Sequence, residues 1–174
     1  MSETLIYDRR TIVFHWLTAA LIVLLWCLAQ TIDWFPNAVR VWPRSAHILT
    51  GVLLVLVYVS RITWRRTGGR HLPAAYSGLM NIAARIAHYG LYALVAVTLA
   101  LGLYYEAIRA DNILNLGRLP SIAPGDRALR NLIGDWHGLA ANAILILAAV
   151  HAAAALYHRY WLKDGVLQRM LGRA

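Results

Sequence analysis

Histidines carry the clearest chemical signal in this sequence. Seven occur in 174 residues, and six of them fall inside or at the edge of long uncharged stretches: His15, His47, His88, His137, His151 and His158. Ionisable side chains in such stretches are costly and usually functional. A single histidine of this kind is more simply explained as a neutral ring bonded to a neighbouring helix. The arrangement of four of them favours a ligand role.

Two of these histidines share one predicted helix. His137 and His151 are 14 residues apart, which corresponds to about 21 Å of helical rise and returns the side chain to within about 40° of the same face. One helix therefore presents two imidazoles, one near each of its ends. If consecutive helices alternate in direction, His47 lies level with His137 and His15 lies level with His151. The sequence predicts two stacked histidine pairs.

The composition of each pair favours haem over a bare metal ion. Each level offers two histidines without a nearby carboxylate or thiolate, whereas zinc and non-haem iron usually take more protein ligands. A porphyrin supplies four nitrogens and leaves two axial positions for histidines. Because the iron then cannot bind a substrate directly, electron transfer is the expected function. No C-x-x-C-H motif is present, so two b-type haems are expected. Gly51 and Gly138 would give a macrocycle room, although close helix packing explains them equally well.

The remaining histidines suggest a quinone site. His88 and His158 lie near the level of His15 and His151 but have no predicted haem partner. A quinone headgroup beside that haem would need proton donors, and imidazole can supply them. Trp161 and Lys163 are expected neighbours of this site. A structural or interfacial role explains each of these histidines at least equally well.

The elements that must position these residues are membrane-spanning helices. The chain is 60% hydrophobic and 14% charged, with a mean hydropathy of +0.52, whereas soluble domains carry about 25% charged residues. A spanning helix needs roughly 20 mostly apolar residues, and isolated strands cannot cross a bilayer. Four uncharged runs meet or approach this length: 12–31, 45–60 with an extension to 64, 86–105 and 136–158. We therefore expect one all-α integral membrane four-helix bundle, a single cytochrome b domain over residues 1–174.

Basic residues predict how the bundle is oriented. Of the 17 Lys and Arg residues, eleven flank the spans on the side of the termini and six on the other, which places both termini in the cytoplasm. The net charge of +9 is mainly this topology signal, and nucleic acid is not an expected partner because no single basic patch forms. The longest connection, residues 106–135, lies on the outer side. It could hold a short surface helix over 127–132.

Several stretches resemble the bacterial cytochrome b561 family and, through it, the di-haem cytochrome b subunits of membrane hydrogenases and formate dehydrogenases. The matching stretches are Phe14-His15-Trp16, Ala46-His47 to Gly51, Ala87-His88-Tyr89-Gly90, Trp136-His137-Gly138, and His151 to His158 leading to Trp161-Leu162-Lys163-Asp164. The resemblance covers nearly the whole chain. It implies a multi-pass protein of the bacterial inner membrane, ligands from the first, second and fourth spans, and electron exchange with ubiquinone. For stand-alone members it also implies oxidation of periplasmic superoxide.

Three functions remain open at this point. A stand-alone enzyme would pass electrons from superoxide to ubiquinone, and the outer Arg44, Arg127 and Arg130 would attract the superoxide anion, although they would equally well bind haem propionates. Alternatively, the chain is the membrane anchor and electron conduit of a hydrogenase or dehydrogenase complex, with a soluble redox partner. The third candidate is a haem-free transporter or structural membrane protein.

Overall fold

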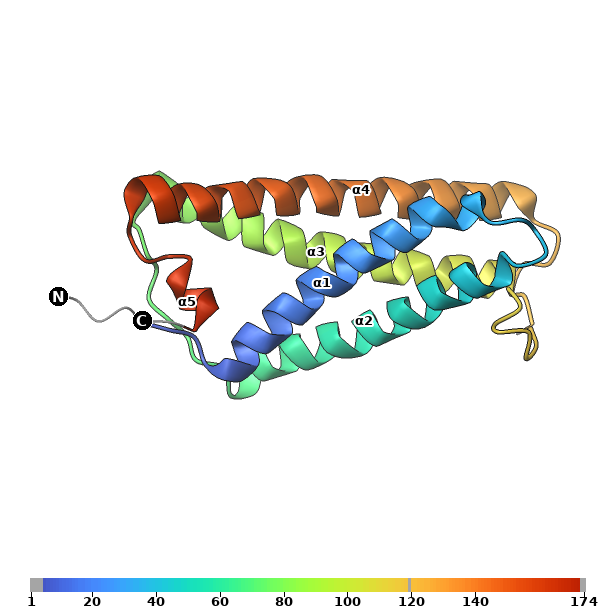
Figure 1. Ribbon diagram of the computed structural model, residues 1–174, viewed down its shortest axis with the longest axis horizontal. Helices are drawn as coiled ribbons and strands as arrows, with labels where there is room; N and C mark the ends of the chain where they lie inside the picture. Colours follow the sequence, from blue (N-terminus) through green and yellow to red (C-terminus); the bar gives the residue numbers. More distant parts are fainter. Residues whose placement is uncertain (1–4, 119, 173–174) are drawn as a thin grey trace.

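The computed structural model describes residues 5–118 and 120–172 and shows four long helices (Figure 1). These are α1 (Arg9–Thr31), α2 (Val41–Thr67), α3 (Gly78–Arg109) and α4 (Arg127–Tyr157). Three short elements, η1 (Ile32–Trp34), the π-helix η2 (His158–Leu162) and α5 (Gln168–Leu171), complete the described residues, which contain no strand. Each long helix is long and apolar enough to cross a membrane. The prediction of an all-α transmembrane four-helix bundle is confirmed.

The helices extend beyond the uncharged runs at their ends. Charged residues at the ends of the spans continue the helical backbone, since a helix that crosses a bilayer projects into the polar interface on both sides. Residues 127–132 are helical, but they form the beginning of α4 and not a separate surface helix. The Asp126 side chain caps α4 by accepting a hydrogen bond of 2.8 Å from the Leu129 amide. The connection between α3 and α4 is consequently limited to residues 110–126.

The four helices form two hairpins. Helix α1 packs mainly on α2, and α3 packs mainly on α4, whereas the close approaches between the hairpins are fewer. Leu21 and Leu54 belong to a buried cluster within the first hairpin. The hairpins meet where Tyr58, Val95 and Ile144 pack together, and the Tyr58 hydroxyl donates a hydrogen bond of 2.7 Å to the Tyr92 carbonyl. The bundle therefore has a thin apolar core between its two halves.

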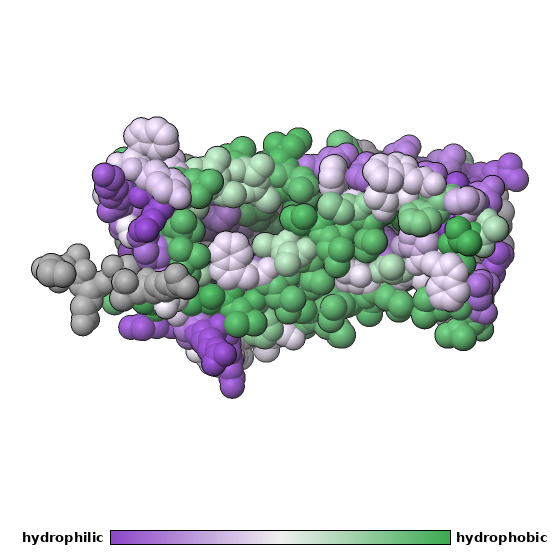
Figure 2. Space-filling view, viewed as in Figure 1, coloured by the Kyte–Doolittle hydropathy of each residue, from purple (hydrophilic) through white to green (hydrophobic). Residues whose placement is uncertain are grey.

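The outer surface of the bundle suits a bilayer. An apolar band covers the middle of the long axis, and polar residues gather at both ends (Figure 2). Large apolar side chains within the helices point outward, among them Leu56, Ile86 and Ile146 with 60%, 67% and 68% of their surface exposed. Contact of such side chains with lipid tails is favourable, whereas their exposure to water would be unfavourable.

The start of α1 and the end of α4 lie at the same end of the bundle, which we call the terminal end; the opposite end is the far end (Figure 1). At the terminal end, Asp8 caps α1 through the Thr11 amide at 3.0 Å and also accepts hydrogen bonds from the Trp64 indole and the Arg70 amide. Burial would raise the pKa of Asp8, but these hydrogen bonds outweigh it and hold the pKa well below its ordinary value. The assignment of this end to the cytoplasm stays a prediction from the basic residues.

Candidate functional site

The structure brings four of the predicted ligand histidines together as two pairs. At the far end, the rings of His47 on α2 and His137 on α4 have centroids 6.3 Å apart, with ring planes at 82°. At the terminal end, His15 on α1 and His151 on α4 have ring centroids 6.4 Å apart, with planes at 70°. We call these the far pair and the terminal pair. Each pair joins one hairpin to the other.

The ring separations fit two imidazoles on opposite sides of one metal ion. A metal–nitrogen distance of about 2 Å on each side places the two ring centroids roughly 6 Å apart. Both pairs match this value, although they lie at opposite ends of the bundle. In residues 5–118 and 120–172, no group of three or more His, Cys, Asp or Glu side chains is placed to hold a metal ion. Two ligands at each level therefore suit a metal whose remaining ligands come from a macrocycle.

Backbone carbonyls orient both rings of the far pair. The Nδ1 atom of His47 lies 3.1 Å from the Leu25 carbonyl oxygen, and that of His137 lies 3.1 Å from the Thr98 carbonyl oxygen. A carbonyl only accepts, so each Nδ1 carries the proton and each Nε2 keeps a free lone pair. This is the usual outer-shell arrangement of metal-ligating histidines.

The surroundings of the far pair leave room for a flat group. A Cβ added to Gly51 or Gly138 would meet nothing within 4 Å, so neither glycine is packed against a neighbouring helix. Gly102 on α3 has the opposite role, because a Cβ there would lie 2.9 Å from Cε1 of His137. The buried Thr98 hydroxyl, on the same helix, has no hydrogen-bond partner. These residues fit a haem, which the far pair would hold through the two Nε2 atoms.

The terminal pair has a different partner. The Nδ1 atom of His15 lies 3.3 Å from Nη2 of Arg61 on α2. Sequence reasoning treated Arg61 only as the charged end of the second span. Helix α2 continues for six residues past Arg61 and places this arginine at the depth of the terminal pair. The sequence signal for this position is the shortness of the uncharged run before Arg61, which is too short to cross a bilayer alone.

His88 is a close neighbour of the terminal pair. Its ring centroid on α3 lies 5.2 Å from that of His151, which is shorter than two opposing ligands of one metal require. The sequence predicted that His88 and His158 form one quinone site. No recorded contact joins them in the described residues, and they belong to separate groups of side chains.

His158 belongs to a cluster outside the helical core. Its Nδ1 atom lies 2.6 Å from Oδ2 of Asp164, and the Tyr76 hydroxyl donates to the same carboxylate oxygen. The hydrogen bond to Asp164 is the main reason that the pKa of Tyr76 rises to about 12. Burial would raise the pKa of Asp164, but the hydrogen bonds from Tyr76 and His158 outweigh it, and the pKa lies below its ordinary value.

The two expected neighbours of His158 lie on its exposed side. Trp161 is 75% exposed and stacks on Tyr157, with ring centroids 5.9 Å apart. Lys163 has a left-handed backbone, with φ of 51°, and ends the π-helix η2. The π-helix continues α4 to Leu162, and the left-handed backbone of Lys163 then turns the chain so that Asp164 contacts His158. Sequence reasoning quoted Asp164 only as part of a motif and missed its contact with Tyr76.

The predicted far-end arginines are not one cluster. Arg44 forms an ion pair of 3.6 Å with Asp111 and lines an open cavity of about 320 Å³ together with Arg40 and Arg118, which sequence reasoning missed. Arg127 and Arg130 lie in the first turn of α4 and do not line this cavity.

The chain is similar to several known bacterial proteins. The chain is 25% identical over 167 residues to the probable superoxide oxidase CybB of Yersinia pestis, covering 95% of both chains. It is 28% identical over 170 residues to cytochrome b561 homolog 2 of Escherichia coli K12, covering 92% of this chain and 88% of the relative. It is also 29% identical over 180 residues to cytochrome b562 of Cereibacter sphaeroides, covering 95% and 94%.

The family match extends along nearly the whole chain. The sequence profile described as prokaryotic cytochrome b561 matches residues 6–173, which include all four long helices and both histidine pairs. The resemblance seen in the sequence is therefore confirmed. The chain belongs to the prokaryotic cytochrome b561 family and is a bacterial membrane electron-transfer protein of the haem b type.

Proposed function

We propose that the protein is a di-haem oxidoreductase that takes electrons from superoxide at the far end and delivers them to ubiquinone at the terminal end. The observation that carries this proposal is the equal ring separation of the far and terminal pairs, 6.3 and 6.4 Å. Each haem, when bound, supplies a one-electron carrier. The far end would face the periplasm of a bacterial inner membrane, because fewer basic residues flank the spans there.

Helix α4 sets the path between the two sites. His137 and His151 lie on it 14 residues apart, which is about 21 Å along the axis. His47 on α2 and His15 on α1 close the two sites from the opposite hairpin. If both histidines of a pair hold the haem, superoxide and quinone would have no position left on it to bind. The protein therefore has to bring each of them to the edge of a site.

At the far end, positive charge would attract superoxide. Arg40, Arg44 and Arg118 line the open cavity, and Arg44 precedes His47 by three residues. Each superoxide that gives up one electron leaves as dioxygen, so two superoxide anions are needed for one quinone. Electrostatic steering raises the encounter rate of an anion and weakens with salt.

At the terminal end, quinone reduction needs two electrons and two protons. His88 lies against the terminal pair, and His158 is held by Asp164 and Tyr76. We propose that the quinone headgroup binds near the terminal pair, where His88 donates a proton, and that the separate group around His158 supplies protons from the exposed side. Trp161 and Lys163 would flank the entrance on the exposed side. Quinone reduction that is unchanged in a double His88→Ala, His158→Ala variant would place the site elsewhere.

The ligand assignment has a direct test. Replacing His47 or His137 by Ala should remove the far haem and spare the terminal one, and replacing His15 or His151 should do the reverse. The ratio of haem to protein and the reduced-minus-oxidised visible spectrum measure the outcome. A His47→Ala variant that still contained two six-coordinate haems would refute the pairing. A wild-type protein without a haem spectrum would leave only the transporter or structural role.

The superoxide activity is tested on the purified protein without any partner. Superoxide should reduce it rapidly, and the rate should fall as ionic strength rises. Neutralising Arg40, Arg44 and Arg118, which line the far-end cavity, should lower the rate further. Fast reduction without salt dependence would support the superoxide activity but refute the electrostatic attraction of superoxide by the far-end arginines. Slow reduction, together with co-purification of a soluble redox enzyme, would indicate the conduit subunit of a larger complex.

A further inference from the structure

Arg61 is a positive charge at the depth of the terminal pair, and the described residues place no acidic partner on it. It is partly buried on α2, and its Cζ atom lies 5.1 Å from the ring centroid of Tyr92 on α3. Its Nη2 atom lies 3.3 Å from His15 on α1. The ion pairs recorded in the described part of the chain do not include Arg61. A charge inside a membrane span is expensive and is usually kept for a function.

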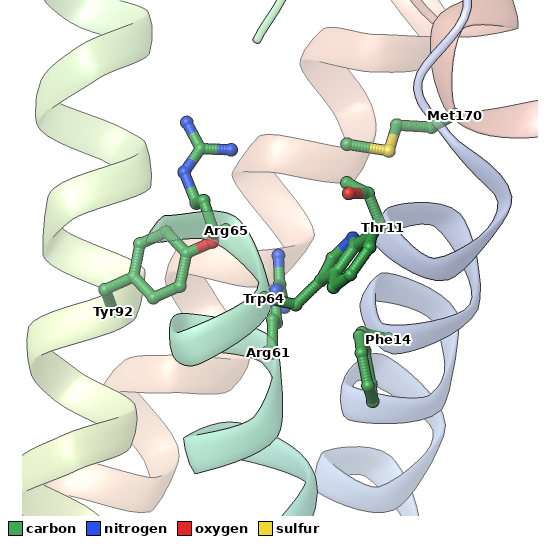
Figure 3. A pocket seen from close by; sticks show the side chains of 7 residues that line it. All are labelled: Thr11, Phe14, Arg61, Trp64, Arg65, Tyr92 and Met170. Atoms are coloured by element: carbon green, nitrogen blue, oxygen red, sulfur yellow. The ribbon is translucent and has the colours of Figure 1, made fainter. Parts of the chain in front are cut away.

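The described side chains that line the pocket around Arg61 include no carboxylate, although Asp8 accepts hydrogen bonds from two of them, Thr11 and Trp64. Figure 3 shows Arg61 between α1, α2 and α3, close to an indole and a phenol ring. The side chains that line this pocket are Thr11, Phe14, Arg61, Trp64, Arg65, Tyr92 and Met170. They are neutral apart from the two arginines. The positive charge of Arg61 therefore acts on the terminal pair in surroundings that screen it weakly.

The two histidine pairs consequently have unlike electrostatic surroundings. Both rings of the far pair donate from Nδ1 to a backbone carbonyl, at 3.1 Å each. His15 of the terminal pair has Arg61 beside it instead, with no carbonyl recorded against its Nδ1 in the described residues. When Nε2 of His15 binds a metal, Nδ1 keeps its proton and cannot accept from a guanidinium, so Arg61 acts there as a nearby positive charge. A carbonyl acceptor makes an imidazole ligand more basic and favours the oxidised metal, whereas a nearby cation disfavours it. Both differences raise the reduction potential of the terminal site relative to the far site.

We infer that Arg61 is a positioning residue for electron flow: it holds the reduction potential of the terminal-end haem above that of the far-end haem. Electrons that enter at the far pair then move downhill to the terminal pair, where the proposed quinone site lies. The inference rests on the proposed function, because it requires a haem at each pair. It adds a physical cause for the proposed direction of transfer, which the similar geometry of the two pairs does not supply.

The test is a potentiometric titration of the haem-loaded protein, followed by visible spectroscopy, in wild type and in Arg61→Gln, Arg61→Lys and Arg66→Gln variants. Repeating it in a His47→Ala background identifies the terminal haem as the one that remains. The terminal haem should have the higher potential in wild type. Arg61→Gln should lower its reduction equilibrium about tenfold, which corresponds to about 59 mV for one electron. Arg61→Lys keeps the charge and should retain more than half of the effect.

The exposed Arg66 at the same end of α2 is the matched control. Neutralising Arg66 should change the reduction equilibrium of each haem less than threefold. The inference is overturned if the far haem has the higher potential in wild type, or if Arg61→Gln leaves the potentials unchanged or moves both equally. If the Arg61→Gln variant does not fold, the inference is still tested by which haem has the higher reduction potential in wild type and by the potentials of the Arg61→Lys variant. A wild-type protein that binds no haem would defeat the proposed function itself.

Discussion

Gly102 allows α3 to approach the far pair, and adding one methyl group there should weaken a single haem site. In a Gly102→Ala variant, the new Cβ would lie 2.9 Å from Cε1 of His137. Ordinary van der Waals contact begins at about 3.4 Å, so the His137 ring has to retreat from α3 by roughly 0.5 Å. The hydrogen bond from its Nδ1 atom to the Thr98 carbonyl, now 3.1 Å, would stretch to the limit of about 3.5 Å and be lost.

The magnitude follows from the role of that hydrogen bond. Removing an outer-shell partner of a ligating histidine typically lowers metal affinity 10- to 100-fold, which is about 1.4 to 2.7 kcal/mol. We therefore expect the far haem of the Gly102→Ala variant to bind 10- to 100-fold more weakly, while the terminal haem is unaffected. The helix itself should not suffer, because Ala stabilises a helix interior by up to about 1 kcal/mol relative to Gly.

The assay is the haem-to-protein ratio of the purified protein, together with the rate of haem loss to an excess of apomyoglobin. Gly90→Ala is the matched control, since it lies on the same helix and its Cβ would meet only the flexible tip of Leu147, at 3.2 Å. The control should keep both haems. Equal haem content and equal rates of loss in the two variants would refute the argument that Gly102 seats His137.

Three further predictions concern stability. Asp8→Ala removes the cap of α1 and its other hydrogen bonds, and should cost about 1–2 kcal/mol in a thermal melt followed by circular dichroism; an unchanged melt would contradict this. The fully buried Ser45 hydroxyl accepts a hydrogen bond of 2.9 Å from the Leu114 amide. Ser45→Ala removes this bond and should lower the free energy of unfolding by about 1–3 kcal/mol in the same melt. The pKa of Asp164 is lowered by folding, so its contribution to stability is present at neutral pH and is lost as pH falls through the folded-state pKa. Tyr76→Phe should raise that pKa and move the acid transition, followed by tryptophan fluorescence, to higher pH; an unmoved transition would argue against the hydrogen bond.

The spans were predictable because the bilayer imposes a simple rule on the sequence. Runs without charge correspond to the helices, and the 14-residue interval between His137 and His151 holds because both belong to one uninterrupted helix, α4. The helix ends were less predictable. Charged residues such as Arg127 are compatible with both a helix and a connection, and the capping of α4 by Asp126 decided between them.

The contacts around the site were less accessible to sequence reasoning. Arg61 was read as a flanking charge, and its place beside His15 depends on how α1 and α2 pack. The contact between Asp164 and His158 depends on the π-helix after α4, which no pattern in the sequence indicates. The grouping of Arg44 with Arg127 and Arg130 assumed that nearness to the histidines in the chain gives nearness in space. The connections at the far end instead place Arg40 and Arg118 beside Arg44.

The weak packing between the two hairpins has a consequence for how the protein matures in the cell. Each hairpin has its own internal contacts, but the histidine pairs lie across the boundary between them. A group bound by both members of a pair would therefore hold the two hairpins together. A ligand that binds only the assembled bundle stabilises the bundle in proportion to the logarithm of the free ligand concentration. Newly inserted chains should wait as separate hairpins, exposed to membrane proteases, until haem arrives. The abundance of this protein should consequently follow the iron and haem supply of the bacterium.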